Sequence, residues 1–220
     1  MATKAQRSDR RGEALSKERI VEVAIELLDT AGESALTFRA LADRLATGSG
    51  AIYWHVANKD DLLAATTNAV IARVMTDVDG RTQPRQAIRA IALGVFDVIT
   101  AHPWVGTQLS RAPWQSAMLR IFESVGQQLQ ALGVPKRAQF NSASAVVNYV
   151  LGIAGQNAAA ARLLPRGTDR STFLATVAAQ LDRAEFPFVH QMAAQLRDHD
   201  DREQFLAGVD LILAGIGAAR

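Results

Sequence analysis

The sequence predicts an all-α protein. Apolar residues recur at spacings of three and four in almost every segment, which is the pattern of a helix with one buried face. No segment alternates apolar and polar residues as a strand does, and no strand–helix–strand order or internal repeat is present. Apolar residues make up 49% of the 220 residues and charged residues 21%, which is typical of a globular chain.

The apolar spacing sets the bounds of the expected helices, and start and stop residues stand at many of them. The expected helices span residues 16–31, 37–45, 49–56, 60–78, 84–101, 113–132, 136–164, 171–180, 187–197 and 202–218. The residues that suit a helix start are Ser16, Thr37, Pro84, Pro113 and Pro187. The residues that end a helix are Gly32, Asn58, Pro103 and Gly133.

The longest stretch without a charge, residues 138–161, lies in one expected helix. It has the length of a membrane span, but it carries several polar side chains that hydrocarbon would leave unsatisfied. They are Gln139, Asn141, Ser142, Ser144, Asn148, Gln156 and Asn157. We therefore expect a buried helix and no membrane partner.

Composition and motifs exclude several function classes. The chain has no cysteine, which excludes a disulfide scaffold, a thiol nucleophile and a thiolate zinc site. No nucleophile–base motif, phosphate loop or HExxH-like spacing is present, so we expect no enzyme and no cofactor. His102 and His190 pair with no acid cluster, so no metal site is expected. Residues 1–15 lack the apolar run of a signal peptide, which favours the cytoplasm.

Residues 36–63 carry most of the information about function. Two short helices joined by three residues, behind a longer helix, are the arrangement of a helix-turn-helix, whose second helix lies in the DNA major groove. Here the second helix is 49–56. Ile52 and Val56 point inward, and small residues at 48–51 let the helix start come close to DNA. The residues with outward-pointing polar tips are Tyr53, Trp54 and His55.

The run IYWHVANKDDLL and its surroundings carry a family resemblance. The residues concerned are Thr37, Arg39, Leu41, Ala42, Leu45, Ile52, Tyr53, His55, Asn58 and Lys59. With them, residues 16–63 resemble the tetracycline-repressor (TetR) family of bacterial transcriptional regulators, and the branch of the tetracycline repressor itself in particular. The C-terminal half is similar to that branch more loosely, through HPW, RAPW and FLAGVDLILAGI. The turn departs from the family, with Ala46 for a frequent glycine and Gly48 for a frequent serine.

The resemblance implies a domain organisation and residue roles. It implies a flexible basic arm over 1–15, a helix-turn-helix DNA-binding domain over 16–62, and a helical ligand-binding and dimerisation domain over 63–220. Against base edges or close to them it places Arg39, Gly48, Ser49, Gly50, Ala51 and Trp54. On phosphates it places Thr37, Tyr53, His55 and Lys59. Two alternatives stay open: Arg39 contacts a phosphate or solvent, and Trp54 packs on a neighbouring helix.

The C-terminal half is larger than a DNA-binding module needs. Gly152 and Gly155 inside a helix each cost ~1 kcal/mol relative to alanine, which is tolerable where two backbones approach closely. Together with the stripe of residues Phe205, Val209, Ile212 and Ile216, this helix is expected to form an isologous homodimer. The alternative is that both helices are intramolecular core.

Candidates for an effector cavity lie on the helices expected to surround it. They are Phe96, Trp104, Trp114, Met118, Phe122 and Asn148. An apolar pocket with few polar groups suits a small molecule, but each apolar candidate is alternatively a core residue and Asn148 a satisfied buried amide. A magnesium ion beside the ligand, as in the tetracycline-binding branch, rests on the resemblance alone.

Together these observations predict a ligand-responsive regulator. It would bind a palindromic double-stranded DNA operator as a homodimeric repressor and be released by a small apolar molecule. The alternative is a DNA-binding regulator without a small-molecule effector, controlled by its abundance or by a protein partner. The net charge is only +2, and residues 16–60 hold five basic and seven acidic residues. We expect the acids of the first helix to lie on a solvated face, which leaves the basic residues for DNA.

Overall fold

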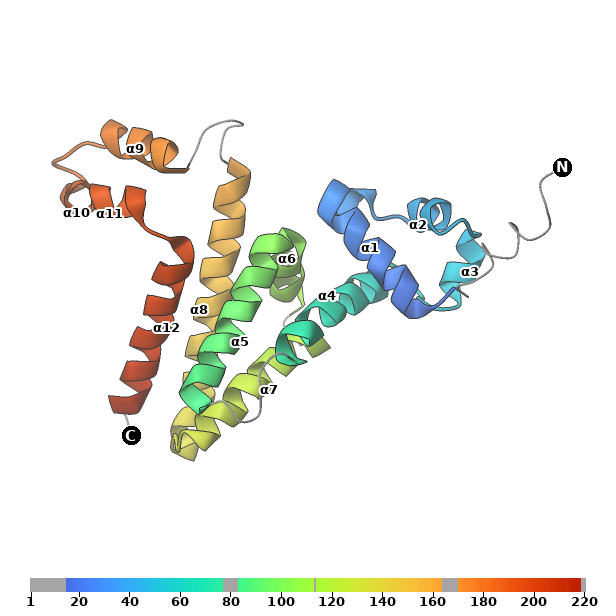
Figure 1. Ribbon diagram of the computed structural model, residues 1–220, viewed down its shortest axis with the longest axis horizontal. Helices are drawn as coiled ribbons and strands as arrows, with labels where there is room; N and C mark the ends of the chain where they lie inside the picture. Colours follow the sequence, from blue (N-terminus) through green and yellow to red (C-terminus); the bar gives the residue numbers. More distant parts are fainter. Residues whose placement is uncertain (1–14, 77–82, 113, 164–169, 219–220) are drawn as a thin grey trace. The chain divides into compact units, whose positions relative to one another are not determined.

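The computed structural model describes residues 15–76, 83–112, 114–163 and 170–218 (Figure 1). Every regular element in these ranges is helical, so the expected fold class is confirmed. The elements are α1 (Lys17–Ala31), the 3-10 turn η2 (Glu33–Ala35), α2 (Phe38–Arg44), α3 (Ser49–Tyr53), α4 (Lys59–Thr76), α5 (Pro84–Ala101), α6 (Pro103–Arg111), α7 (Ser116–Ala131), α8 (Lys136–Leu163), α9 (Arg170–Gln180), α10 (Pro187–Gln191), α11 (Ala193–Asp198) and α12 (Asp201–Ala218). The expected basic arm lies almost wholly outside the described residues.

The chain forms two compact units. Unit 1 takes the described residues up to Arg73 together with Trp104–Arg120, and unit 2 takes Val74–Pro103 and the residues from Ile121 onward. The first unit therefore contains α1 to α3 and most of α4 and α6. The expected domain boundary at 62 and 63 remains a prediction.

The core of unit 1 is built on the apolar face of α1. The spacing of three and four places its apolar side chains on one side of the helix, as expected. The buried residues of α1 are Ile20, Val21, Val23, Ala24, Ile25, Leu27 and Leu28. Ser16 caps the helix by accepting a hydrogen bond from the Arg19 amide at 3.2 Å, and Gly32 ends it.

Helix α6 was not expected from the sequence. Pro103 ends α5, as predicted, but it is also the first residue of α6, a position that suits its fixed φ. The Trp104 indole N–H donates to Asp29 Oδ1 at 2.7 Å. The Glu33 carboxylate accepts from Arg111 at 2.8 Å and from Gln108 at 3.1 Å. Asp29 is exposed, as expected for the acids of the first helix, and together with Glu33 it also holds α6 against α1 and η2.

Unit 2 has a core of three helices, α5, α8 and α12, which pack side by side (Figure 1). The Phe205 ring stacks between Phe96 at 4.5 Å and Tyr149 at 5.6 Å. Burial raises the pKa of Tyr149, and its hydroxyl donates to the Phe205 carbonyl at 3.2 Å. An ion pair between Arg202 and Asp97 at 3.0 Å also ties α12 to α5. These contacts fix α12 within its own unit.

The stripe expected to dimerise on α12 mostly faces inward. Phe205, Val209 and Leu213 are buried, whereas Ile212 and Ile216 are half-buried. The burial of these residues supports the alternative that they belong to the intramolecular core.

Among the described residues, no single helix is long and apolar enough to cross a membrane. One bent pair, α5 with α6, reaches the necessary length and apolar composition.

A close approach of two helices in unit 2 gives a stability prediction. A Cβ added at Gly208 of α12 would overlap the side chain of Tyr149, whereas one added at Gly126 of α7 would meet nothing within 4 Å. We expect Gly208→Ala to lower the free energy of unfolding by about 1–3 kcal/mol, because overpacking outweighs the gain in helix propensity. Gly126→Ala, the control, should raise it by up to about 1 kcal/mol. Urea denaturation measures both, and equal effects would contradict the close approach.

Candidate nucleic-acid interface

The turn between α2 and α3 sets how the second helix is presented. Thr37 caps α2 by accepting from the Ala40 amide at 3.1 Å, as its sequence position predicts. At the other end, the Thr47 amide donates to the Ala42 carbonyl at 3.0 Å, and the Ala46 amide donates to the Asp43 carbonyl at 3.4 Å. These two bonds form a Schellman turn, and Ala46 takes the left-handed position with φ 50°. The turn is therefore tight, but an alanine occupies a left-handed conformation that residues with a Cβ disfavour.

Helix α3 is shorter than predicted, with five residues from Ser49 to Tyr53. Ile52 is fully buried and Val56 is 4% exposed, which confirms their inward orientation. The Ile52 carbonyl accepts from the amides of both His55 and Val56 at 2.9 and 3.0 Å, so the chain turns out of the helix there. The two inward side chains anchor a helix that is otherwise on the surface.

The start of α3 offers bare backbone. Gly48, Ser49 and Gly50 are exposed and Ala51 is half-buried. Gly48 stands at the N-cap without a side-chain hydrogen bond to the helix. A Cβ added at Gly48 or Gly50 would meet nothing within 4 Å. Another molecule can therefore come close to this end of the helix, as the sequence predicts.

The three outward residues at the end of α3 gather on one surface. The Tyr53 ring stacks on Phe38 of α2 with centroids 4.3 Å apart and an interplanar angle of 6°, and 55% of Tyr53 stays exposed. Trp54 is 90% exposed, so it does not pack on a neighbouring helix within unit 1. Phe38 was missed by sequence reasoning, because nothing in the sequence links it to a partner in the next helix.

The two expected cationic contacts differ in their surroundings. Arg39 is exposed and forms no ion pair with a residue that the structure describes. Lys59 is half-buried, and its Nζ donates to the Glu33 carbonyl at 2.7 Å. Lys59 thus ties the start of α4 to η2, and its ammonium group keeps other hydrogens for an external acceptor.

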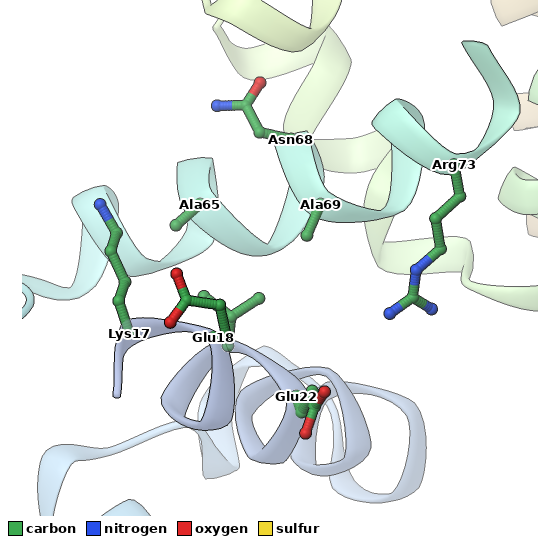
Figure 2. A pocket seen from close by; sticks show the side chains of 8 residues that line it. Lys17, Glu18, Glu22, Ala65, Asn68, Ala69 and Arg73 are labelled. Carbon is green, nitrogen blue, oxygen red and sulfur yellow. The ribbon is translucent and has the colours of Figure 1, made fainter. Parts of the chain in front are cut away.

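A groove runs along α4, in two hollows of about 450 and 500 Å³. Tyr53, Trp54 and His55 line the first hollow, so the structure brings these three predicted residues together. Lys17, Ala65 and Asn68 line both hollows. Figure 2 shows the second hollow, where Glu18 of α1 points toward Ala65 of α4. Sequence reasoning missed Lys17, which adjoins the predicted residues only after folding.

The expected effector residues fall in both units, and their role in ligand binding remains a prediction. Trp104, Trp114 and Met118 belong to unit 1, whereas Phe96, Phe122 and Asn148 belong to unit 2. Trp104 is 5% exposed and bonded to Asp29, whereas Trp114 is 83% exposed.

Within unit 2, Phe96 is buried against Phe205, and Phe122 lies tilted at 6.0 Å from the exposed Phe140. Asn148 is exposed, so it is not a satisfied buried amide. None of the six candidates lines the groove along α4 or the hollow between α9 and α11.

Metal binding has no support from side-chain clusters. In the ranges of the chain that the structure covers, no three His, Asp or Glu side chains gather closely enough to hold a metal ion. The expectation of no metal site remains a prediction.

The strained turn at Ala46 gives a second stability prediction. Because a left-handed conformation costs a residue with a Cβ about 1–2 kcal/mol, we expect Ala46→Gly to raise the free energy of unfolding by about 1 kcal/mol. Ala40→Gly inside α2 is the control, and it should lower that free energy by about 1 kcal/mol. Thermal unfolding distinguishes the two, and destabilisation by both would contradict strain at Ala46.

Two family profiles match the chain and together span most of it. The profile described as the tetR family of bacterial regulatory proteins matches residues 20–66, which include the helix-turn-helix. The profile described as the tetracyclin repressor-like C-terminal domain matches residues 79–220, more than half of the chain.

Individual relatives agree with these profiles. The solved structure of SCO7222, a TetR transcriptional regulator from Streptomyces coelicolor, is 51% identical with a TM-score of 0.84, over 93% of this chain and 99% of that one. An HTH-type transcriptional regulator from Saccharopolyspora erythraea is 36% identical over 140 residues, which are 63% of this chain and 59% of that relative. ActR from Streptomyces coelicolor, solved in complex with actinorhodin, has a TM-score of 0.74 at 22% identity over 94% of this chain and 99% of that one, and so shares the fold. The chain belongs to the TetR family of bacterial transcriptional regulators.

Proposed function

We propose that the protein is a homodimeric, ligand-responsive repressor that binds a palindromic DNA operator. The observation that carries the proposal is the surface of α3, a short helix with a bare start, two buried anchors and three exposed polar-tipped residues. In a dimer, each α3 enters one of two successive major grooves, so the operator repeats its half-site about one helical turn apart.

In the proposed complex, side chains divide between base edges and backbone. Arg39 reads a base through its two-pronged donor group, and its exposure without an ion pair supports that role. Ser49, Gly50, Ala51 and Trp54 face the base edges beside it. The hydroxyl of Tyr53, the imidazole of His55, and the polar groups of Thr37 and Lys59 hold phosphates and set the register.

Exposed stripes on α8 and α12 support a homodimer. A solvent-facing helix surface normally carries charged residues, but these stripes have none. On α8 the exposed residues between 141 and 159 are Asn141, Ala145, Asn148, Gly152, Gln156 and Ala159, and on α12 those between 207 and 214 are Ala207, Leu211 and Ala214. Exposed charges stand at the N-terminal ends of the two helices, at Lys136, Arg137, Arg202 and Glu203. The small residues let two backbones approach, and Leu211, 75% exposed, supplies apolar area. We assign Asn148 to this surface rather than to an effector cavity.

We propose that a small apolar molecule, with no cofactor or metal, releases the protein from DNA. The size of the helical part beyond the helix-turn-helix supports this, as does the fold shared with ActR, which was solved with actinorhodin. An effector must bind the two states of the protein with different affinities, and coupling free energies of this kind are about 1–3 kcal/mol. A thermal-shift screen tests the idea: a compound that raises the melting temperature should also weaken operator binding.

A regulator without an effector is the second candidate. The observation that favours it is that three expected effector residues have other surroundings within their own units: Phe96 packs against Phe205, Trp104 bonds Asp29, and Asn148 is exposed. If this candidate is correct, no compound will both stabilise the protein and weaken its operator complex. Transcription is then controlled by the amount of the protein or by a protein partner.

Two substitutions separate base reading from phosphate contact. Arg39→Ala should relax the preference at one base pair in each half-site, because a matched bidentate contact is worth about 1–3 kcal/mol. Tyr53→Phe keeps the stack on Phe38 but removes the hydroxyl, so it should weaken binding to all sequences about equally. Binding to a library of single-base operator variants measures both. A uniform loss for Arg39→Ala would make it a phosphate contact.

A charge on the exposed stripe of α12 should break the dimer. We expect Leu211→Glu to give monomers at micromolar concentration, because it would bury two like charges at a two-fold interface. Leu119→Glu, at a 47% exposed leucine of α7, is the control and should leave the mass unchanged. Light scattering after size exclusion gives the mass, and a dimeric Leu211→Glu variant would place the interface elsewhere.

A further inference from the structure

The two hollows of the groove along α4 share Lys17 and differ in their other charged residues. On one side of Lys17 lie Tyr53 and His55, which the proposed function places on DNA phosphates. On the other side lie Glu18 and Glu22, on the same wall of the groove, together with Arg73 of α4 (Figure 2). Asp61 lines the first hollow, where its carboxylate accepts a hydrogen bond from the Asn58 side chain at 3.0 Å. Lys17 is the residue of α1 that lines both hollows, so it stands where the two environments meet.

The carboxylates of Glu18 and Glu22 in the second hollow are held by nearby groups. The pKa of Glu18 is lowered by a hydrogen bond from its own backbone amide, by the Ser16 side chain, and by the nearby side chain of Lys17. Glu18 is therefore ionised at neutral pH. Glu22 forms an ion pair with Arg19 at 3.2 Å, so Arg19 is already engaged. A phosphate chain that followed the groove past Lys17 would meet two carboxylates.

Lys17 itself is available for an external anion. Its side chain is exposed and makes no ion pair with a residue in the described ranges. It shares a hollow with the polar ends of Tyr53 and His55, and the nearby floor of that hollow is formed by the small residues Ala57, Ala64 and Ala65. A chain of phosphates bound by Tyr53 and His55 can therefore reach Lys17 over these alanines, with Trp54 and Asp61 at the rest of the lining.

We propose that Lys17 is the outermost DNA-phosphate contact of this unit, and that Glu18 and Glu22 end the bound stretch of backbone beyond it. The occupant of the first hollow is the phosphodiester backbone of the operator, continuous with the surface of α3. This inference rests on the proposed DNA-binding function and adds a residue to it. Phosphate contacts of this kind strengthen binding to every sequence and give no base preference.

The test compares two basic residues of the same helix. Lys17→Ala removes the proposed contact, and Arg19→Ala removes an equal charge two residues away that is paired with Glu22 and lines neither hollow. The full-length protein is titrated onto a duplex selected by the wild type from random-sequence DNA, and onto a scrambled duplex, over about 0.05–0.3 M KCl.

We expect Lys17→Ala to reduce the slope of log K against log salt by about 0.9 for each bound subunit, on both duplexes. At about 0.1 M salt this corresponds to a loss of roughly eightfold per subunit. Lys17→Arg should restore the slope, and Arg19→Ala should keep it within error. A Lys17→Ala slope equal to that of Arg19→Ala would overturn the assignment. A wild type that binds neither duplex would instead refute the proposed DNA-binding function itself.

A second variant tests the repelling side of the groove. Glu18→Gln removes one carboxylate beside Lys17, so it should strengthen binding to both duplexes by about twofold per subunit. Glu123→Gln on α7 makes the same change of net charge outside the groove and should leave the affinity unchanged. Equal affinities for the two variants would show that Glu18 does not limit the bound backbone.

Discussion

The short helix α3 depends for its stability on side chains that pack against the rest of its unit. A helix of five residues does not persist in water on its own, because its few hydrogen bonds do not offset the ordering of the chain. It is held by the buried side chains of Ile52 and Val56 and by the stack of Tyr53 on Phe38. The apolar face of α1 builds the core of the same unit, and α6 is bonded to the end of α1 and to η2. The geometry of the surface proposed to read DNA is thus a property of the whole unit.

Local patterns predicted most of the fold and the outline of the candidate site. Apolar spacing found the buried face of α1 and the inward pair Ile52 and Val56. It did not find α6, because Pro103 is both a stop for one helix and a start for the next. Nor did it find Asp29 and Glu33 as hydrogen-bond acceptors, since their partners lie 75 or more residues further along the chain. Such pairings have no period, so they emerge only when the chain is folded.

Residues 16–60 hold more acidic than basic residues, but most of these acids have partners within the folded chain. Asp29 and Glu33 are engaged by α6, and Glu22 by Arg19. Glu26 lies 3.9 Å from Arg44, a looser pair. These carboxylates serve internal contacts. Of the acids in residues 16–60, Glu18 and Glu22 line the groove beside Lys17, and Asp61, just outside that range, lines it as well. Net charge is therefore a poor guide to DNA binding here, because the position of each charge decides what it repels.

The bare start of α3 has an evolutionary consequence. At Gly48 and Gly50 a new side chain would meet no atom of the protein, and at Gly50 it would also improve helix propensity. The fold therefore imposes little selection on these two positions. After a gene duplication, one copy can acquire new side chains here and drift toward another operator without losing stability. Two regulators descended from this chain could then separate their target genes by a few substitutions on one turn of helix.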